Sequence, residues 1–216
     1  MNGTYKIKRG GATYLQQDGI EVLELEVTPL SIDGAWLVKP KTHTDSRGQF
    51  REWFKPLELV AQIGRDFSAA QGNISTSKKG TLRGIHYSLA AQGQAKWVTC
   101  LSGRIKDVVV DIRVDSPSFG KSVTLELNGT SGQALLIGEG LGHGFLSMEE
   151  DSLVAYLVSS PYSPFEEFEI NPFDAELNID WGTDKNELKL SPKDASAPSL
   201  LQLKDAGKLP KIYSGS

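Results

Sequence analysis

Histidine is rare in this chain, and one histidine stands where catalysis could use it. Of the three, His43, His86 and His143, the second lies in the stretch GTLRGIHYS, which otherwise reads as a buried strand. Histidine titrates near neutral pH and can accept a proton and release it again, so His86 is a candidate general base. A structural histidine in the wall of a sheet is an equally good reading of this stretch taken alone.

His143 lies in the glycine-rich stretch GEGLGHGFL, which we interpret as a turn between strands. Glycine lets the backbone turn tightly and approach a ligand closely. The stretch has no GK[ST] sequence, so it is not a nucleotide-binding P-loop. Read alone, it favours an ordinary turn with an exposed histidine over a ligand site.

Two basic residues and one tyrosine lie in strand-like runs rather than in polar loops. Arg83 and Lys96 could grip a diphosphate through charge-assisted hydrogen bonds if the fold brings them together. Tyr156 has a high ordinary pKa and stays protonated at neutral pH, so it could donate a proton to a carbanion. Surface charge is the default for a basic residue and a core position for a tyrosine, so these roles depend on the fold.

A metal site needs ligands at suitable spacing. No two histidines stand in a short pattern such as H-x-H, and none has a nearby glutamate in a metal-binding pattern. We therefore expect no bound metal.

The elements that would carry these side chains read as short strands. Runs rich in Val, Ile, Leu, Thr and aromatic residues alternate with Gly, Ser, Pro, Asn or Asp, a pattern typical of an all-β sandwich or barrel. One short helix is expected at 56–64 and another at 198–209, capped near Ser199. The proline-rich stretch 161–181 is expected to be ordered loop. The strand-like runs are 25–30, 35–40, 50–54, 81–89, 95–103, 104–114, 122–129, 133–138, 143–148 and 152–160.

Alternation along three of these runs places a polar side chain in apolar company. A barrel interior can carry such groups when they converge on a ligand and satisfy one another. The expected shared faces are Lys96 with Val98 and Cys100, Asp107 with Val109, Asp111 and Arg113, and Tyr156 with Val154 and Val158. Val108, Val110 and Ile112 are expected on the opposite face of the second strand.

Length, charge and cysteine content bound the class of protein. The 216 residues fit one domain, which we place at 25–216 after a polar extension or tag at 1–24. The net charge of -4 gives no sign of a nucleic-acid or anionic-membrane partner, and no window approaches the ~18 apolar residues of a membrane span. The single cysteine, Cys100, and the lack of an apolar secretion signal favour a cytoplasmic protein.

Several stretches together resemble the dTDP-4-dehydrorhamnose 3,5-epimerase family, in the family's order over residues 45–210. The resemblance implies a cupin-type jelly-roll barrel with a short C-terminal helix and an N-terminal arm, and a homodimer. It also implies cofactor-independent epimerisation at C3 and C5 of dTDP-4-dehydro-6-deoxy-D-glucose, a nucleotide-linked 4-keto-6-deoxyhexose. The stretches are DSRGQFREWF (45–54), QGNISTSKKGTLRGIHYS (71–88), QAKWVTCLSGRIKDVVVDIR (94–113), GLGHGF (140–145), PYSPFEE (161–167) and LSPKDASAP (190–198).

The resemblance assigns roles to residues at the matching motif positions. His86, in the RGxHY motif, is the base, and Asp194, in the SxKD motif, is the carboxylate that pairs with it. Tyr156 is the acid, and Asp107 supports His143. Tyr162 is expected to stack on the nucleotide base. The remaining substrate-contact positions fall on Arg47, Glu52, Gln71, Asn73, Arg83, Lys96, His143, Glu167 and Lys193.

Two features depart from the family pattern. The polar N-terminal extension is not part of it, and Leu157 stands where many members carry a basic residue, which bears on substrate preference. Arg83 and His86 are three residues apart, so a flat strand would point them to opposite faces. We expect Gly84 to mark a bulge that re-aims them; otherwise the two contact different parts of the site. The alternatives are an epimerase that inverts only C3 or C5, a metal-dependent cupin enzyme, and a non-catalytic sugar-nucleotide-binding jelly roll.

Overall fold

The computed structural model describes residues 4–9, 12–17 and 24–213, with side chains for 24–213. One sheet contains β8 (Leu82–Ser88), β10 (Arg104–Asp111), β11 (Ser122–Asn128), β13 (Leu141–Ser147) and β15 (Glu167–Glu169). The other contains β3 (Leu25–Pro29), β4 (Ala35–Pro40), β7 (Gln71–Ser77), β9 (Lys96–Ser102), β12 (Ala134–Ile137) and β14 (Ser152–Val158).

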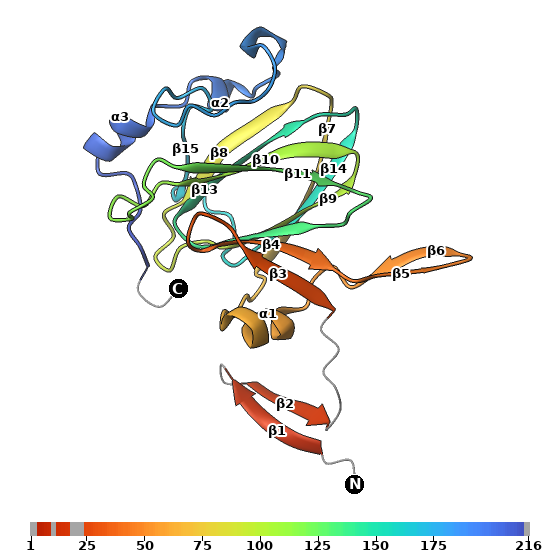
Figure 1. Ribbon diagram of the computed structural model, residues 1–216. Helices are drawn as coiled ribbons and strands as arrows, with labels where there is room; N and C mark the ends of the chain where they lie inside the picture. Colours follow the sequence, from red (N-terminus) through yellow and green to blue (C-terminus); the bar gives the residue numbers. More distant parts are fainter. Residues whose placement is uncertain (1–3, 10–11, 18–23, 214–216) are drawn as a thin grey trace.

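The two large sheets lie face to face and form the predicted jelly-roll barrel (Figure 1). The five-stranded sheet has the order β11-β10-β13-β8-β15, and the six-stranded sheet the order β3-β4-β12-β9-β14-β7. Neighbours in these orders are mostly distant in sequence, so the barrel is built from non-local antiparallel pairs. Chain segments 70 or more residues apart therefore meet in the barrel wall.

Alternating side chains divide the core as the sequence predicts. Val98, Cys100, Val109 and Val154 pack between the two sheets. The opposite face of β10 packs beneath the C-terminal segment through Val108, Val110 and Ile112, which meet Trp181, Leu200 and Leu203. On the outer side of the six-stranded sheet, Trp97 and Leu136 pack with Leu59 and Phe67. Each sheet is thus covered on its outer side and leaves its inner face for a core and a cavity.

Within the described residues, three short helices lie outside the barrel: α1 (Pro56–Ile63), α2 (Pro192–Ala195) and α3 (Leu200–Asp205), with a 3-10 turn at Lys185–Glu187. The predicted helix at 56–64 is confirmed, and it ends where Gly64 adopts the left-handed conformation at φ 70°. The predicted C-terminal helix is also confirmed, although it is shorter than expected. Ser199 caps it in a reciprocal capping box with Gln202.

Several of the described strands escape the sequence pattern. β7 reads QGNISTS, a polar run, because Gln71 and Asn73 point into a cavity rather than into an apolar core. The predicted strand at 50–54 is wrong beyond Arg51, where β6 (Gly48–Arg51) ends. Phe54 instead turns onto Phe67 and Trp97, with ring centroids 5.5 and 5.4 Å away. The stretch 161–181, predicted as ordered loop, contains the short strand β15.

Two hairpins stand apart from the large sheets (Figure 1). β1 (Thr4–Arg9) pairs with β2 (Ala12–Gln17) within the predicted extension 1–24, whose remaining residues 1–3, 10–11 and 18–23 lie outside the described part. The division of the chain at residue 25 stays a prediction. β5 (Thr42–Asp45) pairs with β6 in a hairpin that projects from the barrel and that we call the arm.

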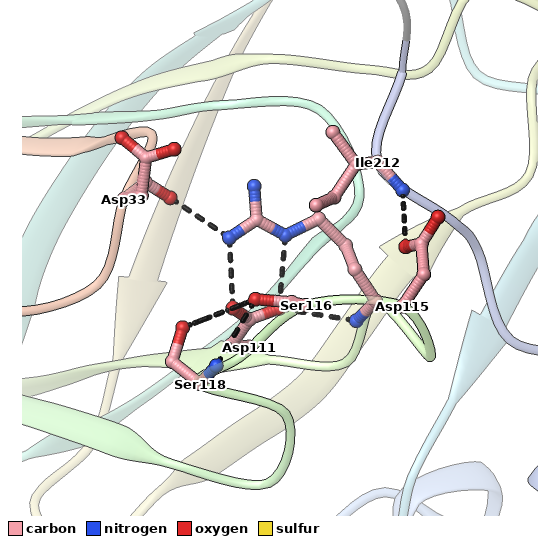
Figure 2. Close-up of polar contacts among 7 residues, drawn as sticks. Asp33, Asp111, Asp115, Ser116, Ser118 and Ile212 are labelled. Carbon is pink, nitrogen blue, oxygen red and sulfur yellow. Dashed lines mark hydrogen bonds and ion pairs between the residues drawn. The ribbon is translucent and has the colours of Figure 1, made fainter.

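A buried ion pair closes the end of β10. Arg113 donates through Nε and Nη2 to the two carboxylate oxygens of Asp111, at 2.9 and 2.7 Å, and also to the Asp33 carbonyl (Figure 2). Ser116 and Ser118 donate to the same carboxylate at 2.6 Å each. Burial disfavours the Asp111 carboxylate, but these donors outweigh burial and hold its pKa below the ordinary value.

We predict that Arg113→Met lowers the free energy of unfolding by about 3–5 kcal/mol, because it leaves the Asp111 carboxylate buried without its cation. The midpoint of urea unfolding measures this. Because the pKa of Asp111 is depressed, its stabilising contribution is present above pH ~4 and is lost as pH falls through the folded pKa. The deficit should therefore shrink in acid.

The matched control for this prediction is Arg104→Met. Arg104 pairs with Glu126 and Glu149 on the surface, where exposed pairs contribute about 1 kcal/mol or less. Equal losses in the two variants would contradict the assignment of a buried, stabilising pair to Arg113.

Candidate active site

A cavity of about 360 Å³ opens at one end of the barrel. β7, β9 and β14 contribute its walls from one sheet, and β8 and β15 from the other, while α2 closes its rim. Most of the residues predicted from the sequence line this cavity: His86, Tyr156, Asp194, Gln71, Asn73, Arg83, Lys96, Tyr162, Glu167 and Lys193.

The expected irregularity at Gly84 brings Arg83 and His86 to the same cavity. The pairing of β8 with β13 shifts register between His143 and Phe145. A side chain at Gly84 would meet the Cα of Gly144 at 2.5 Å, and the backbone has φ 117°, so only glycine fits. The prediction of a bulge here is confirmed, and it explains how residues three apart share one cavity.

His86 is oriented by a buried carboxylate. Its Nε2 lies 2.6 Å from Oδ1 of Asp194, whose side chain is 4% exposed, whereas the imidazole is 40% exposed. Ser191 caps α2 by accepting from the Asp194 backbone N–H, which fixes the aspartate on the first turn. Burial raises the pKa of Asp194, but the hydrogen bond and charge of His86 outweigh it and lower the pKa overall. The carboxylate therefore orients the imidazole while leaving the ring accessible.

Lys96 is a buried cation beside the histidine. Its Nζ donates to the His86 carbonyl at 3.3 Å, and the residue is 7% exposed. Burial lowers the pKa of Lys96, while the charges of Glu167 and Asp107 act in the opposite direction. Such a cation in a water-poor cavity can stabilise an oxyanion strongly.

Tyr156 faces the cavity from the other sheet. It lies on β14 between Val98 and Asn73 of the neighbouring strands, whereas His86 lies on β8. Burial raises the pKa of Tyr156, although Arg83 opposes this, so the phenol keeps its proton at neutral pH. The imidazole and the phenol thus belong to opposite walls of one cavity.

His143 lies within β13 and is 8% exposed. The strand predicted at 143–148 is therefore confirmed as far as Ser147, whereas the interpretation of this residue as an exposed histidine in a turn is wrong. Gly142 and Gly144 flank it because a side chain at either position would meet Ile85 at 2.7–2.8 Å. Nε2 of His143 lies 2.9 Å from both oxygens of Asp107, which is fully buried. His143 pairs directly with His86 across the two strands but is not among the residues that line the cavity.

Two predicted contact residues lie away from the cavity of their own chain. Arg47 sits at the turn of the arm, pairs with Asp45 and is 89% exposed. Glu52 follows the arm and pairs with Lys55 at 2.8 Å. Neither residue lines the cavity that holds His86.

Three polar residues at the site were missed from the sequence. Gln94 and Ser191 line the cavity, and Glu169 forms an ion pair of 2.7 Å with Lys193 at its rim. The S-P-x-D sequence at 191–194, a cap followed by proline at the first helical position, could have revealed Ser191. Alternation could have revealed Gln94, two residues before Lys96 in the stretch QAKW.

No group of three or more His, Cys, Asp or Glu side chains within residues 24–213 is placed to hold a metal ion. His43, the third histidine, lies on β5 in the arm and pairs with Glu24 at 3.1 Å. Among the helices of the described residues, none is long and apolar enough to cross a membrane.

Comparison with known proteins identifies the family. The model of the dTDP-4-dehydrorhamnose 3,5-epimerase family matches residues 29–202. The chain belongs to this family. A dTDP-4-dehydrorhamnose 3,5-epimerase from Mycolicibacterium smegmatis is 46% identical over 181 residues, which cover 84% of this chain and 89% of that protein. The predicted fold class and enzyme class are thereby confirmed.

Relatives within the family differ in the number of centres that their names assign. A dTDP-4-dehydro-6-deoxyglucose 3-epimerase from Streptomyces bikiniensis is 42% identical over 182 residues, 84% of this chain and 92% of that protein. Among solved structures, a dTDP-6-deoxy-D-glucose-3,5-epimerase from Legionella pneumophila Philadelphia 1, in complex with dTDP-4-keto-L-rhamnose, has a TM-score of 0.82. It is 37% identical, and the match covers 88% of this chain and all of that one.

Proposed function

We propose that this epimerase inverts C3 and C5 of dTDP-4-dehydro-6-deoxy-D-glucose to give dTDP-4-dehydro-L-rhamnose. The observation that carries the proposal is the placement of His86 and Tyr156 on opposite walls of one cavity. A base on one face of a hexose and an acid on the other are what inversion at carbon requires.

The chemistry starts from the ketone at C4, which acidifies the hydrogens at C3 and C5. His86 removes one of these protons, and Asp194, 2.6 Å from its Nε2, stabilises the resulting imidazolium. The electrons of the broken C–H bond move onto the C4 oxygen and form an enolate. Tyr156 then protonates the carbon from the opposite face, which inverts it. No redox cofactor is needed, because the substrate arrives as a ketone.

Cationic side chains complete the site. Lys96, buried beside His86, stabilises the enolate oxygen. His143, which Asp107 holds in place on the neighbouring strand β13, supports this stabilisation. Arg83 and Lys193 hold the diphosphate and Tyr162 stacks on the nucleotide base, so the remote part of the substrate orients the reacting carbons. Gln71, Asn73 and Glu167 provide the remaining polar contacts.

The test is proton exchange in heavy water with dTDP-4-keto-6-deoxyglucose, followed by NMR. Deuterium should appear at both C3 and C5, in a product of inverted configuration. Deuterium at C3 alone would support the single-centre alternative, which the 3-epimerase relative favours. Binding without exchange at either carbon would overturn the proposal.

We further propose a cytoplasmic homodimer in which the arm serves the partner's cavity. The arm is exposed along nearly its whole length, including Phe50 at 66%, and an isolated two-stranded hairpin is only marginally stable in water. A twofold dimer would cover it and bring Arg47 and Glu52 to a substrate that they do not reach in their own chain.

Co-expression of two inactive chains tests this exchange. One carries Arg47→Ala and the other His86→Asn, so a mixed dimer contains one cavity with an intact histidine and an intact arm from its partner. Activity should return in the mixed dimer, although each variant alone is impaired. Arg47 acting within its own chain predicts no recovery, and an active monomer in sedimentation would contradict the dimer.

A further inference from the structure

Gln94 is a buried polar residue in the turn between β8 and β9, and it has both of its amide hydrogens engaged. It is 6% exposed and lines the cavity. Its Nε2 donates to the Ser160 carbonyl at 3.2 Å and to Oε1 of Glu167 at 3.1 Å. Ser160 follows the end of β14 and Glu167 begins β15, so one side chain joins the two ends of the segment 161–166.

The contact matters because of what Glu167 does. Glu167 and Lys96 line the same cavity, and the charge of Glu167 acts against the lowering of the Lys96 pKa by burial. A carboxylate is held firmly by a hydrogen bond from a buried amide, since charge-assisted bonds are roughly twice as strong as neutral ones. The place of the Glu167 charge therefore depends on Gln94.

We propose that Gln94 is a positioning residue of the active site, which fixes the Glu167 carboxylate and the Ser160 end of the adjoining segment so that this carboxylate keeps its place as the counter-charge in the cavity that it shares with Lys96. The inference rests on the proposed function only for the task of Lys96, the stabilisation of the enolate oxygen. The contacts of Gln94 do not depend on that task.

Gln94 can act on Lys96 through one hydrogen bond, the bond to Glu167. The charged and titratable groups around Lys96 and its cavity come from every neighbouring element: Arg83 and His86 from β8, Asp107 from β10, His143 from β13, Tyr156 from β14, Tyr162 from the following segment, Glu167 from β15, and Lys193 and Asp194 from α2. Among the hydrogen bonds of the described residues, Gln94 touches only Glu167 of this set.

The test compares Gln94→Met, which keeps the length of the side chain but has no donor, with Gln92→Met, an exposed residue of the same turn. The Lys96 ammonium is titrated by NMR in protein with carbon-13 at the lysine ε position, and the signal is assigned with Lys96→Arg. We expect Gln94→Met to move the Lys96 midpoint to lower pH by about half a unit or more, because its counter-ion is no longer held. Gln92→Met should leave it unchanged.

A double variant tests whether the effect of Gln94 on Lys96 passes through Glu167. In a Glu167→Gln background, Gln94→Met should shift the Lys96 midpoint no further, because the counter-ion is already gone. An unchanged midpoint in Gln94→Met, or an equal additional shift in the double variant, overturns the proposal. Should Gln94→Met fail to fold, Gln94→Asn, whose shorter amide cannot span both partners, carries the same measurement.

Turnover gives a second, separate readout. The value of kcat/KM should fall about tenfold in Gln94→Met, the usual effect of losing one hydrogen bond to a charged group. The NMR titration needs no substrate. An inactive wild-type protein would therefore contradict the proposed reaction, whereas the role of Gln94 would still be decided by the titration alone.

Discussion

Replacement of His86 with asparagine should lower kcat by about 10³-fold, within the range that a lost general base costs. Asparagine keeps a polar side chain of similar size against Asp194 but cannot take a proton from carbon. The groups proposed to hold the nucleotide lie elsewhere in the cavity, so binding of dTDP should stay close to that of the wild type. Initial rates of epimerisation and calorimetric binding of dTDP measure the two effects.

The control for this variant is Glu126→Gln. Glu126 lies on β11, pairs with Arg104 on the surface and is outside both the cavity and the arm. Its replacement should leave turnover unchanged. A folded His86→Asn protein with near-normal turnover would falsify the role of His86, and parallel losses in both variants would point to a general effect of removing a titratable side chain.

The sequence predicts most of the barrel because its apolar strands follow simple physical rules. β10 shows this best: its alternation separates Val108 and Val110, under the C-terminal segment, from Asp107 and Val109 inside the barrel. The sequence pattern fails to predict a strand whose inward side chains are polar because they line the cavity. β7 places Gln71 and Asn73 toward the cavity, so it has no apolar alternation for a pattern to detect.

The site is predictable only as far as its motifs extend. His86, Tyr156 and Asp194 come from strands and a helix more than 30 residues apart, and only the fold shows that they share a cavity. Gln94 escapes notice because a buried amide has no distinctive chemistry until its acceptors are known. The arm is a different case. Its residues match the family motif, yet among the described residues of a single chain the hydrogen bonds and the ion pair of Arg47 all go to Asp45.

Replacement of Tyr156 with phenylalanine should separate the two halves of the reaction. Proton removal belongs to His86 on β8, and reprotonation from the opposite face belongs to the phenol on β14. Without the phenol, the enolate can still form, since Lys96 and Asp194 are untouched. The rate at which inverted product appears should therefore fall by at least about 100-fold, within the range for a lost general acid.

Deuterium reveals the surviving half. The imidazole is 40% exposed, so a proton that it has removed exchanges with solvent before it returns. In heavy water, the Tyr156→Phe protein should return deuterium to the same face and yield labelled substrate of unchanged configuration, at a rate within a few-fold of the wild type. Equal losses of exchange and of inversion would mean that one group performs both proton transfers. The partition between labelled substrate and inverted product thus measures directly which wall of the cavity supplies each proton.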